Sequence, residues 1–345
     1  MAIVRLEQHN SFDGEQTVST NSKSETLSGR QVEPANPLLQ PPTALAAQAA
    51  QLVDDLRLAF GRHRARAVHA KGIILTGNFL PSETARTLSK AALFSGPAIP
   101  VIIRFSNFTG IPNIPDNIID ANPRGLAIKL GTGGFESLDI VSHSFNGFPV
   151  STAQEFGILL RSIASSGAGV PKPTPLDKYL ESHAIAKRFL TTQEPPPESY
   201  ATTAYFGVNS VAFLNEANER TFVRYRFVPE AGEHYLDEAT RKSMGPNYLS
   251  EEIATRIATA PIRFDWYAQL ATADDEIEDP SIAWPESRAT AKLGTISIEC
   301  LVPDQQEASR SLLFMPATFP PGIEAADPML AVREVAYPIS YDERR

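Results

Sequence analysis

Arg333 and Tyr337 are the residues whose types and spacing most directly suggest joint chemistry, and they lie four positions apart in LAVREVAYP. On an α-helix, residues at this spacing share a face, so the guanidinium can lie beside the phenol. A neighbouring cation favours the phenolate and lowers a tyrosine pKa that is ordinarily about 10. Tyrosinate is a known axial ligand of haem iron, so the pair is a candidate iron ligand with its cation. The alternative is a tyrosine that only packs, with its hydroxyl at the surface.

His69 is the second candidate, in RAVHAKG at 66–72, where the strand-like run GIILTGNF begins. A histidine in this setting can be a packing residue, a metal ligand or a catalytic base, and packing is the commonest of the three. None of the six histidines forms an HxxxH or HxH pair. This argues against a zinc or non-haem iron site built from histidines.

The elements that must position these residues follow from the apolar pattern. Helical spacing predicts helices over 43–62, over 152–165 with a threonine cap, and near 176–190. Short apolar runs divided by Gly, Pro and Asn predict antiparallel strands between 66 and 150 and again between 209 and 301. A C-terminal helix is expected to end at Pro338. The fold class predicted is α+β, an antiparallel barrel with flanking helices, over 39–345, preceded by a mobile arm over 1–38.

Composition narrows the class of protein. The 345 residues are 42% hydrophobic and carry a formal net charge of −9, which argues against non-specific binding of nucleic acid. No apolar run is long enough to span a membrane, and the N-terminal residues do not resemble a secretory signal. Cys300 is the single cysteine, so an intramolecular disulfide and a thiolate cluster are both excluded. We therefore expect a cytoplasmic enzyme.

Several segments, in order along the chain, resemble motifs of the haem catalases. In the first half these are RAVHAKG, IIRFSNFTG, ANPRGLAIKL and LDIVSHSFNGFPVSTAQEF; in the second half they are WYAQLATADDEIEDPSIAWP, KLGTISI and FPPGIEAADPMLAVREVAYP. The motifs span about 66–345, and the sequence ends directly after the last of them. The chain is thereby similar to the small catalase-related haem peroxidases, which lack the C-terminal extension of larger catalases.

This resemblance implies an eight-stranded antiparallel β-barrel with haem b bound beside it. His69 then corresponds to the distal histidine above the iron, and Ser106 holds its ring. Tyr337 corresponds to the proximal iron ligand, with Arg333 beside it. The resemblance also implies that three apolar side chains shape the haem pocket, namely Val68, Phe148 and Phe156. It implies that three arginines bind the haem propionates, namely Arg66, Arg104 and Arg344.

One position departs from the family pattern. Aligned without gaps, the distal asparagine of the family falls on His143, and Asn146 lies three residues further along. Either His143 takes the catalytic role of that asparagine, or a local shift brings Asn146 into the pocket, or His143 lies outside the pocket on the barrel surface.

The function implied is that of a haem-dependent peroxidase with weak catalase activity, acting in the response to oxidative stress. It would reduce hydrogen peroxide or organic hydroperoxides through a ferryl intermediate, using an organic electron donor. One alternative is an organic or fatty-acid hydroperoxide-transforming enzyme of the allene oxide synthase type. Val68 argues against that branch, which has threonine before the distal histidine. A haem-binding protein without turnover is the other alternative, and a homo-oligomeric state stays open.

Overall fold

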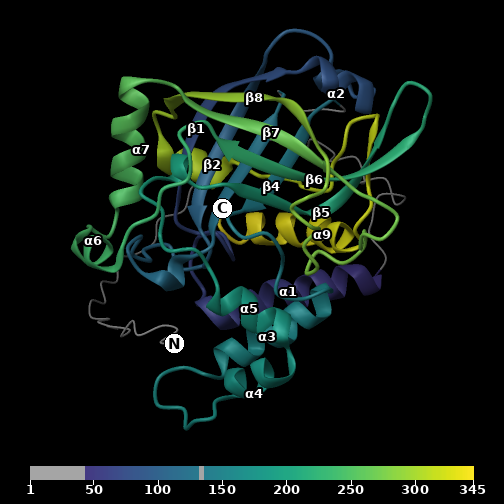
Figure 1. Cartoon of the computed structure of the whole chain (residues 1–345). Coiled ribbons are helices and arrows are strands. Elements are labelled where there is room, and N and C mark those ends of the chain that lie inside the picture. The colour runs from purple at the N-terminus through teal and green to yellow at the C-terminus, as the bar shows by residue number, and fades with distance from the viewer. Residues whose placement is uncertain (1–42, 132–135) are drawn as a thin grey trace, which may run out of the picture.

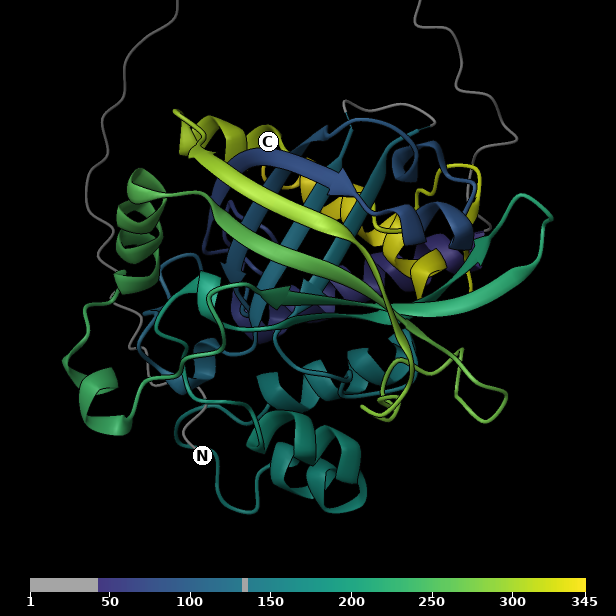
Figure 2. The same cartoon turned by 45° about the horizontal axis from the view of Figure 1, so that its top comes forward.

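The core of the computed structural model is an antiparallel sheet that closes on itself. The structure describes residues 43–131 and 136–345, so the predicted arm over 1–38 lies outside the described residues. Within the described part, nine strands pair in the order β4-β3-β2-β1-β8-β7-β6-β5-β9, and β4 also pairs with β5. That last pairing closes β1–β8 into an eight-stranded barrel (Figures 1 and 2), and β9 pairs with β5. The predicted fold class is confirmed.

The strands lie where the short apolar runs predict them. In chain order they are β1 (Gly72–Pro81), β2 (Ile99–Asn107), β3 (Arg124–Leu130), β4 (Leu138–His143), β5 (Tyr205–Leu214), β6 (Arg220–Pro229), β7 (Ile262–Leu270), β8 (Thr290–Leu301) and β9 (Ile323–Ala325).

Along β2, β3 and β4, side chains that point into the barrel core alternate with side chains that point out of it. Ile103, Ile128 and Ile140 are paired across these strands and are buried in the barrel core with Trp266. Successive side chains of a strand point to opposite faces, so the residues between them point out of the barrel. The outer face of these three strands is therefore available to form a site.

Helices pack on more than one side of the barrel (Figure 1). They are α1 (Thr43–Phe60), α2 (Glu83–Leu88), α3 (Ala153–Ala164), α4 (Pro175–Ser182), α5 (Ala184–Thr191), α6 (Glu238–Ser243), α7 (Tyr248–Thr259), α8 (Gln305–Ser311) and α9 (Met329–Asp342). In Figure 1, α9 lies directly below the barrel, and α1 and α3 form the next layer. The Thr152 hydroxyl accepts from Glu155 N at 3.2 Å, which confirms the threonine cap. The single helix predicted near 176–190 is instead two, divided at His183.

The prediction that the last helix ends at Pro338 is wrong, because α9 continues through this proline to Asp342. Proline removes one backbone donor, which leaves the carbonyl of Glu334 without its usual helical partner. Glu334 is exposed, so water can satisfy that carbonyl. The additional turn matters because Ser340 lines the cavity described below.

A buried polar network joins the ends of β2 and β3 to the segment that carries His69. Arg124 is fully buried and donates to Asn107 Oδ1 and, at 2.7 Å, to the carbonyl of Asp116. The Asp116 carboxylate accepts from Asn107 Nδ2 at 2.7 Å and pairs with Lys71 Nζ at 2.8 Å. Lys71 follows His69 by two residues, so the network holds that segment against the barrel.

Replacing Arg124 with methionine should therefore lower the free energy of unfolding by about 3 kcal/mol or more, because the buried partners lose their cation. Denaturant unfolding of the two proteins measures the difference. Arg220→Met is the matched control: its ion pair with Glu324 is about half exposed, and we expect a loss of about 0.5 kcal/mol at most. Equal losses in the two variants would show that the network does not stabilise the fold.

Candidate functional site: a cation-lined cavity between the barrel and the last helix

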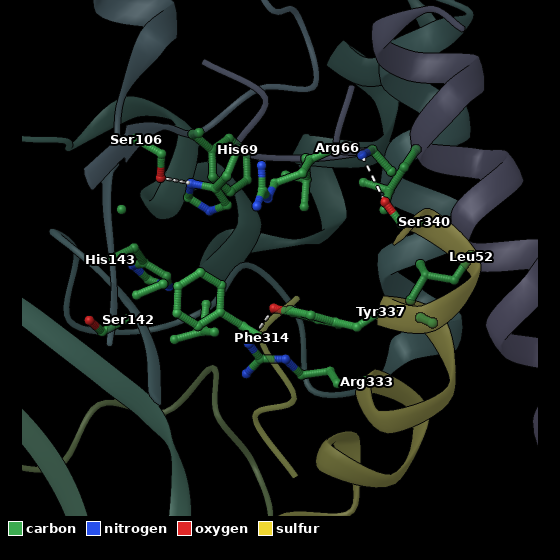
Figure 3. A pocket seen from close by; sticks show the side chains of 18 of the residues that line it. Leu52, Arg66, His69, Ser106, Ser142, His143, Phe314, Arg333, Tyr337 and Ser340 are labelled. Atoms are coloured by element: carbon green, nitrogen blue, oxygen red, sulfur yellow. Dashed lines mark hydrogen bonds between the residues drawn. The ribbon is translucent and has the colours of Figure 1, made fainter. Parts of the chain in front are cut away.

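A large cavity lies between the outer face of the barrel, α9 and α1. Its empty volume, which includes space open to solvent, is about 1350 Å³. Figure 3 shows His69 beside Ser106 on one side of this space, and the Tyr337 hydroxyl beside Arg333 on another. All predicted site residues except Asn146 line it: Arg66, Val68, His69, Arg104, Ser106, His143, Phe148, Phe156, Arg333, Tyr337 and Arg344.

The pairing register of β2, β3 and β4 places the residues that form much of the barrel side of the cavity. Ser106 pairs with Gly125, and Gly125 pairs with His143, so these residues lie side by side across β2, β3 and β4. Two residues away, Arg104, Ala127 and Val141 form a parallel row in the same register. Because positions two apart share a face, both rows point away from the barrel core and toward the cavity.

His69 approaches this wall from an irregular segment with an uncommon backbone conformation. Its φ is +56°, in the left-handed region that is costly for residues other than glycine. The segment is held there because His69 N donates to the Phe108 carbonyl and Ala70 N to the Thr109 carbonyl, each at 2.9 Å. The His69 ring then lies edge-on to the Phe108 ring, and its Nδ1 is 3.0 Å from Ser106 Oγ.

Gly125 provides the room for this arrangement, and our sequence reasoning did not identify it. A Cβ atom at this position would lie 2.5 Å from Ser106 Oγ and 2.6 Å from His69 Nδ1. Both distances are far below normal contact, so only glycine fits beneath the histidine. The glycine in RGLAIKL is visible in the sequence, but its need becomes apparent only when the strand register places it beside His69.

His143 ends β4 and faces the cavity, whereas Asn146 is half-buried and is not among the residues that line it. The His143 ring packs edge-on against Phe189, 6.0 Å away between ring centroids. Its Nδ1 accepts from Phe145 N at 3.4 Å. Its Nε2 is buried and has no hydrogen-bond partner among the described residues. The structure thus brings His143, rather than Asn146, to the wall beside Ser106.

The two cavity histidines are held in their neutral forms. Burial lowers the pKa of His69 from 6.5 to about 3, and repulsion from His143 and Arg104 adds to that effect. Burial also lowers the pKa of His143 to about 3, with a further contribution from Arg333. A neutral imidazole keeps one nitrogen lone pair free, which is the state that a proton acceptor needs.

On the side of α9, Arg333 Nη2 donates to Tyr337 Oη at 2.7 Å, as their helical spacing predicts. Arg333 also donates to Asn209 Oδ1, and Asn209 Nδ2 donates to Asp327 Oδ2 at 2.6 Å. Asn209 lies on β5, and sequence reasoning gave no signal for it. This chain of contacts fixes the guanidinium beside the phenol oxygen.

Three further arginines at the cavity have no carboxylate partner among residues 43–131 and 136–345. Arg66 donates to the Ser309 and Leu312 carbonyls at 2.9 and 2.8 Å, and Arg344 donates to the same Leu312 carbonyl at 2.7 Å. Arg104 donates to the Ala70 carbonyl at 3.0 Å. The ion pairs among the described residues include none of the three: Arg66, Arg104 and Arg344.

Because these arginines lack carboxylate partners among the described residues, their positive charge in the cavity is not neutralised there. Burial, with repulsion from Arg104 and Arg344, lowers the pKa of Arg66 to about 7. Burial lowers the pKa values of Arg104 and Arg344 to about 10. The Nε atoms of Arg104 and Arg344 are buried and lack partners within the described structure. Buried cations require compensation, so the cavity is built for an anionic ligand.

Histidine lies on one wall of the cavity, and a tyrosine with its arginine lies on another. Three arginines there lack carboxylate partners among the described residues. This combination is typical of a haem pocket. The catalase family model matches residues 33–344. The chain is 33% identical to a catalase-related peroxidase of Synechococcus elongatus, over 81% of this chain and 83% of that protein. It is 32% identical to a catalase-related peroxidase of Mycolicibacterium paratuberculosis, over 84% and 92%. The chain therefore belongs to the catalase family.

A solved structure agrees with this assignment at the level of the fold. A fungal catalase superposes with a TM-score of 0.71 at 19% identity, covering 93% of this chain and 66% of that one. No helix in the described part of the chain has both the length and the apolar character to cross a membrane.

Haem is the cofactor of this family, and the residues of the cavity fit it. Haem b carries two carboxylates, and the three arginines without carboxylate partners are the groups that can compensate them. Val68, Phe148 and Phe156 supply apolar walls for the ring system. Tyr337 supplies an oxygen ligand of a type known for haem iron.

The close approach of Ser106 and His69 to Gly125 can be tested by adding a methyl group at this position. Gly125→Ala should lower the free energy of unfolding by about 1–3 kcal/mol, because the new methyl group forces Ser106 and His69 to move. Denaturant unfolding measures it. Gly167→Ala is the control, since a Cβ there meets nothing within 4 Å. If both alanine variants have the same stability, the contact with His69 is not as tight as described.

Proposed function

We propose that this protein is a haem-dependent peroxidase that reduces peroxides at the cavity and disproportionates hydrogen peroxide only slowly. The observation that carries the proposal is the convergence on one cavity of a neutral histidine, a tyrosine with its arginine, and three arginines without carboxylate partners. When bound, haem supplies the iron that exchanges electrons with the peroxide and with the donor.

Tyr337 would hold the iron through its phenolate oxygen. Arg333 supports that charge, because its Nη2 lies 2.7 Å from Oη and its guanidinium is fixed by Asn209. Arg66, Arg104 and Arg344 would bind the carboxylates of the cofactor and so gain the negative partners that the described residues do not provide. These residues would thus hold the cofactor by its iron and by its carboxylates.

His69 moves the proton. In the tautomer whose Nδ1–H donates to Ser106 Oγ, 3.0 Å away, His69 Nε2 keeps a lone pair that would take a proton from the peroxide. The same nitrogen returns that proton to the departing oxygen. The lowered pKa of His69 keeps this acceptor available at neutral and mildly acidic pH. Val68, Phe148 and Phe156 exclude water from the reacting atoms.

His143, rather than Asn146, is the second polar group that faces the peroxide. This follows from its place in the row that contains Ser106 and Gly125, and from its unpaired Nε2. The electrons come from an organic donor, of which a phenol is the simplest test case. A homo-oligomeric state stays a prediction.

Tyr337→Phe should abolish phenolate ligation, because the variant lacks the oxygen that binds iron. The expected result is loss of haem on gel filtration, or a ferric absorption spectrum that is no longer high-spin. Tyr267→Phe, on β7 away from the cavity, serves as the control and should retain both. A Tyr337→Phe protein that keeps the wild-type haem content and spectrum would show that another residue binds the iron.

His69→Ala should retain haem and lose peroxide reduction by roughly 10²–10⁴-fold, the usual contribution of a general acid–base group. Guaiacol oxidation and oxygen evolution, each started with hydrogen peroxide, measure the loss. His63→Ala, at an exposed position, should behave as wild type. Full activity of His69→Ala would remove the proton-transfer role. Wild-type protein without turnover of hydrogen peroxide or an organic hydroperoxide would refute the proposed function.

A further inference from the structure

Ser340 connects the last helix to the segment that carries His69. Its Oγ accepts a hydrogen bond from Ala67 N at 3.1 Å, drawn as the dashed line at Ser340 in Figure 3. Ala67 is buried, so the hydroxyl takes the place of water as the acceptor for this N–H. The contact depends on the turn of α9 that follows Pro338, because a helix that ended there would not place Ser340 at the cavity.

The segment between Ala65 and Ala70 is attached to two different parts of the molecule. On the side of α9, Arg57 Nη2 donates to the Ala65 carbonyl at 2.9 Å, and Arg57 Nε donates to Glu343 Oε2 at 2.9 Å. On the side of the barrel, the N–H groups of His69 and Ala70 donate to carbonyls of the loop that follows β2. The segment therefore crosses the space between α9 and the barrel.

The Ser340–Ala67 hydrogen bond gives the shortest connection between the two halves of the site. Ser340 follows Tyr337 by three residues on α9, and Ala67 precedes His69 by two. Positions three apart share a helix face and are about 4.5 Å apart along the axis. Two residues of chain extend by at most about 7 Å. The connection through the Arg57 side chain is longer and leaves more freedom, so the Ser340 bond limits how far His69 and Tyr337 can move relative to each other.

This spacing has a chemical consequence, because the cofactor ring must fit between His69 and Tyr337. Burial keeps the imidazole of His69 neutral, and a neutral imidazole is the commonest side-chain ligand of metals. A His69 ring that reached the iron would occupy the position that peroxide needs. A ring held too far away could not exchange a proton with the peroxide. The distance between the two residues must therefore stay within narrow limits.

We propose, on the basis of the haem peroxidase function inferred above, that Ser340 is a positioning residue whose hydrogen bond to Ala67 fixes the distance between His69 and Tyr337. The bond thus sets the geometry of the iron site as well as adding stability. Arg66 is the neighbour of Ala67, so the same contact also holds its guanidinium at the cavity.

The contact itself is tested by Ser340→Ala, which removes the acceptor. Hydrogen exchange is measured by mass spectrometry on the full chain loaded with haem, in a peptide that contains Ala67. We expect exchange at this amide to be faster by about tenfold or more, because a buried N–H without a partner favours local opening. Unchanged exchange would show that the hydroxyl does not hold this segment.

The geometry of the iron site is tested by electron paramagnetic resonance of the ferric, haem-loaded protein. Wild type should give one high-spin signal. Ser340→Ala should add a low-spin signal, from molecules in which His69 reaches the iron, and should release haem to apomyoglobin about tenfold faster. Ser340→Thr keeps the hydroxyl and should behave as wild type. A Ser340→Ala protein with the wild-type signal and release rate would overturn the proposal.

Ser89→Ala is the matched control for a general loss of stability. Ser89 Oγ accepts from the buried Ala91 N at 3.1 Å, as Ser340 does from Ala67, but Ser89 is not among the residues that line the cavity. The control should leave the signal and haem release unchanged. Loss of haem from Ser340→Ala alone supports the proposal, whereas equal effects in both variants would overturn it. Wild type that binds no haem, or turns over no peroxide, would instead refute the proposed function itself.

Discussion

The cavity holds more buried positive charge than the described residues can neutralise, and this imbalance explains most of its other features. Arg66, Arg104 and Arg344 are anchored by carbonyl oxygens, which hold the guanidinium groups in place but do not cancel their charge. A ligand with two carboxylates reduces the imbalance. Because such a ligand binds the folded chain alone, it also stabilises the fold by mass action. Cofactor binding and the stability of this region should therefore be closely coupled.

Strand register provides the second constraint. The row formed by Ser106, Gly125 and His143 exists because β2, β3 and β4 are paired without a shift. The His143–Phe206 pair also lies where β4 meets β5 and closes the barrel. The same backbone pairing thus closes the fold and positions the polar groups of the site. Residues on such a scaffold are placed more rigidly than residues on loops.

Sequence reasoning predicted much of the fold and, Asn146 apart, residues that line one cavity, for physical reasons that differ between residues. The Arg333–Tyr337 contact follows from helical spacing alone, so it could be predicted without a structure. The alternation of short apolar runs was enough to predict an antiparallel barrel. The end of the last helix was predicted wrongly, because a proline is tolerated where the carbonyl it leaves free is exposed to water.

Other features depend on contacts between distant segments. Gly125 has a clear role only once it lies beneath His69, 56 positions earlier in the chain, and Asn209 only once β5 lies beside α9. The choice between His143 and Asn146 as the residue on the cavity wall required the register of β4, which no local pattern fixes. Residues whose roles rest on close approach or on pairing between strands are the ones that a single sequence does not reveal.

The central claim is that Tyr337 binds haem iron as a phenolate. Resonance Raman spectroscopy of the ferric, haem-loaded protein, prepared with ordinary and with ring-deuterated tyrosine, tests it most directly. The account predicts phenolate bands, excited through the tyrosine-to-iron charge-transfer absorption, that shift on deuteration and are absent from Tyr337→Phe. A spectrum without deuterium-sensitive bands, or one that Tyr337→Phe leaves unchanged, would contradict it.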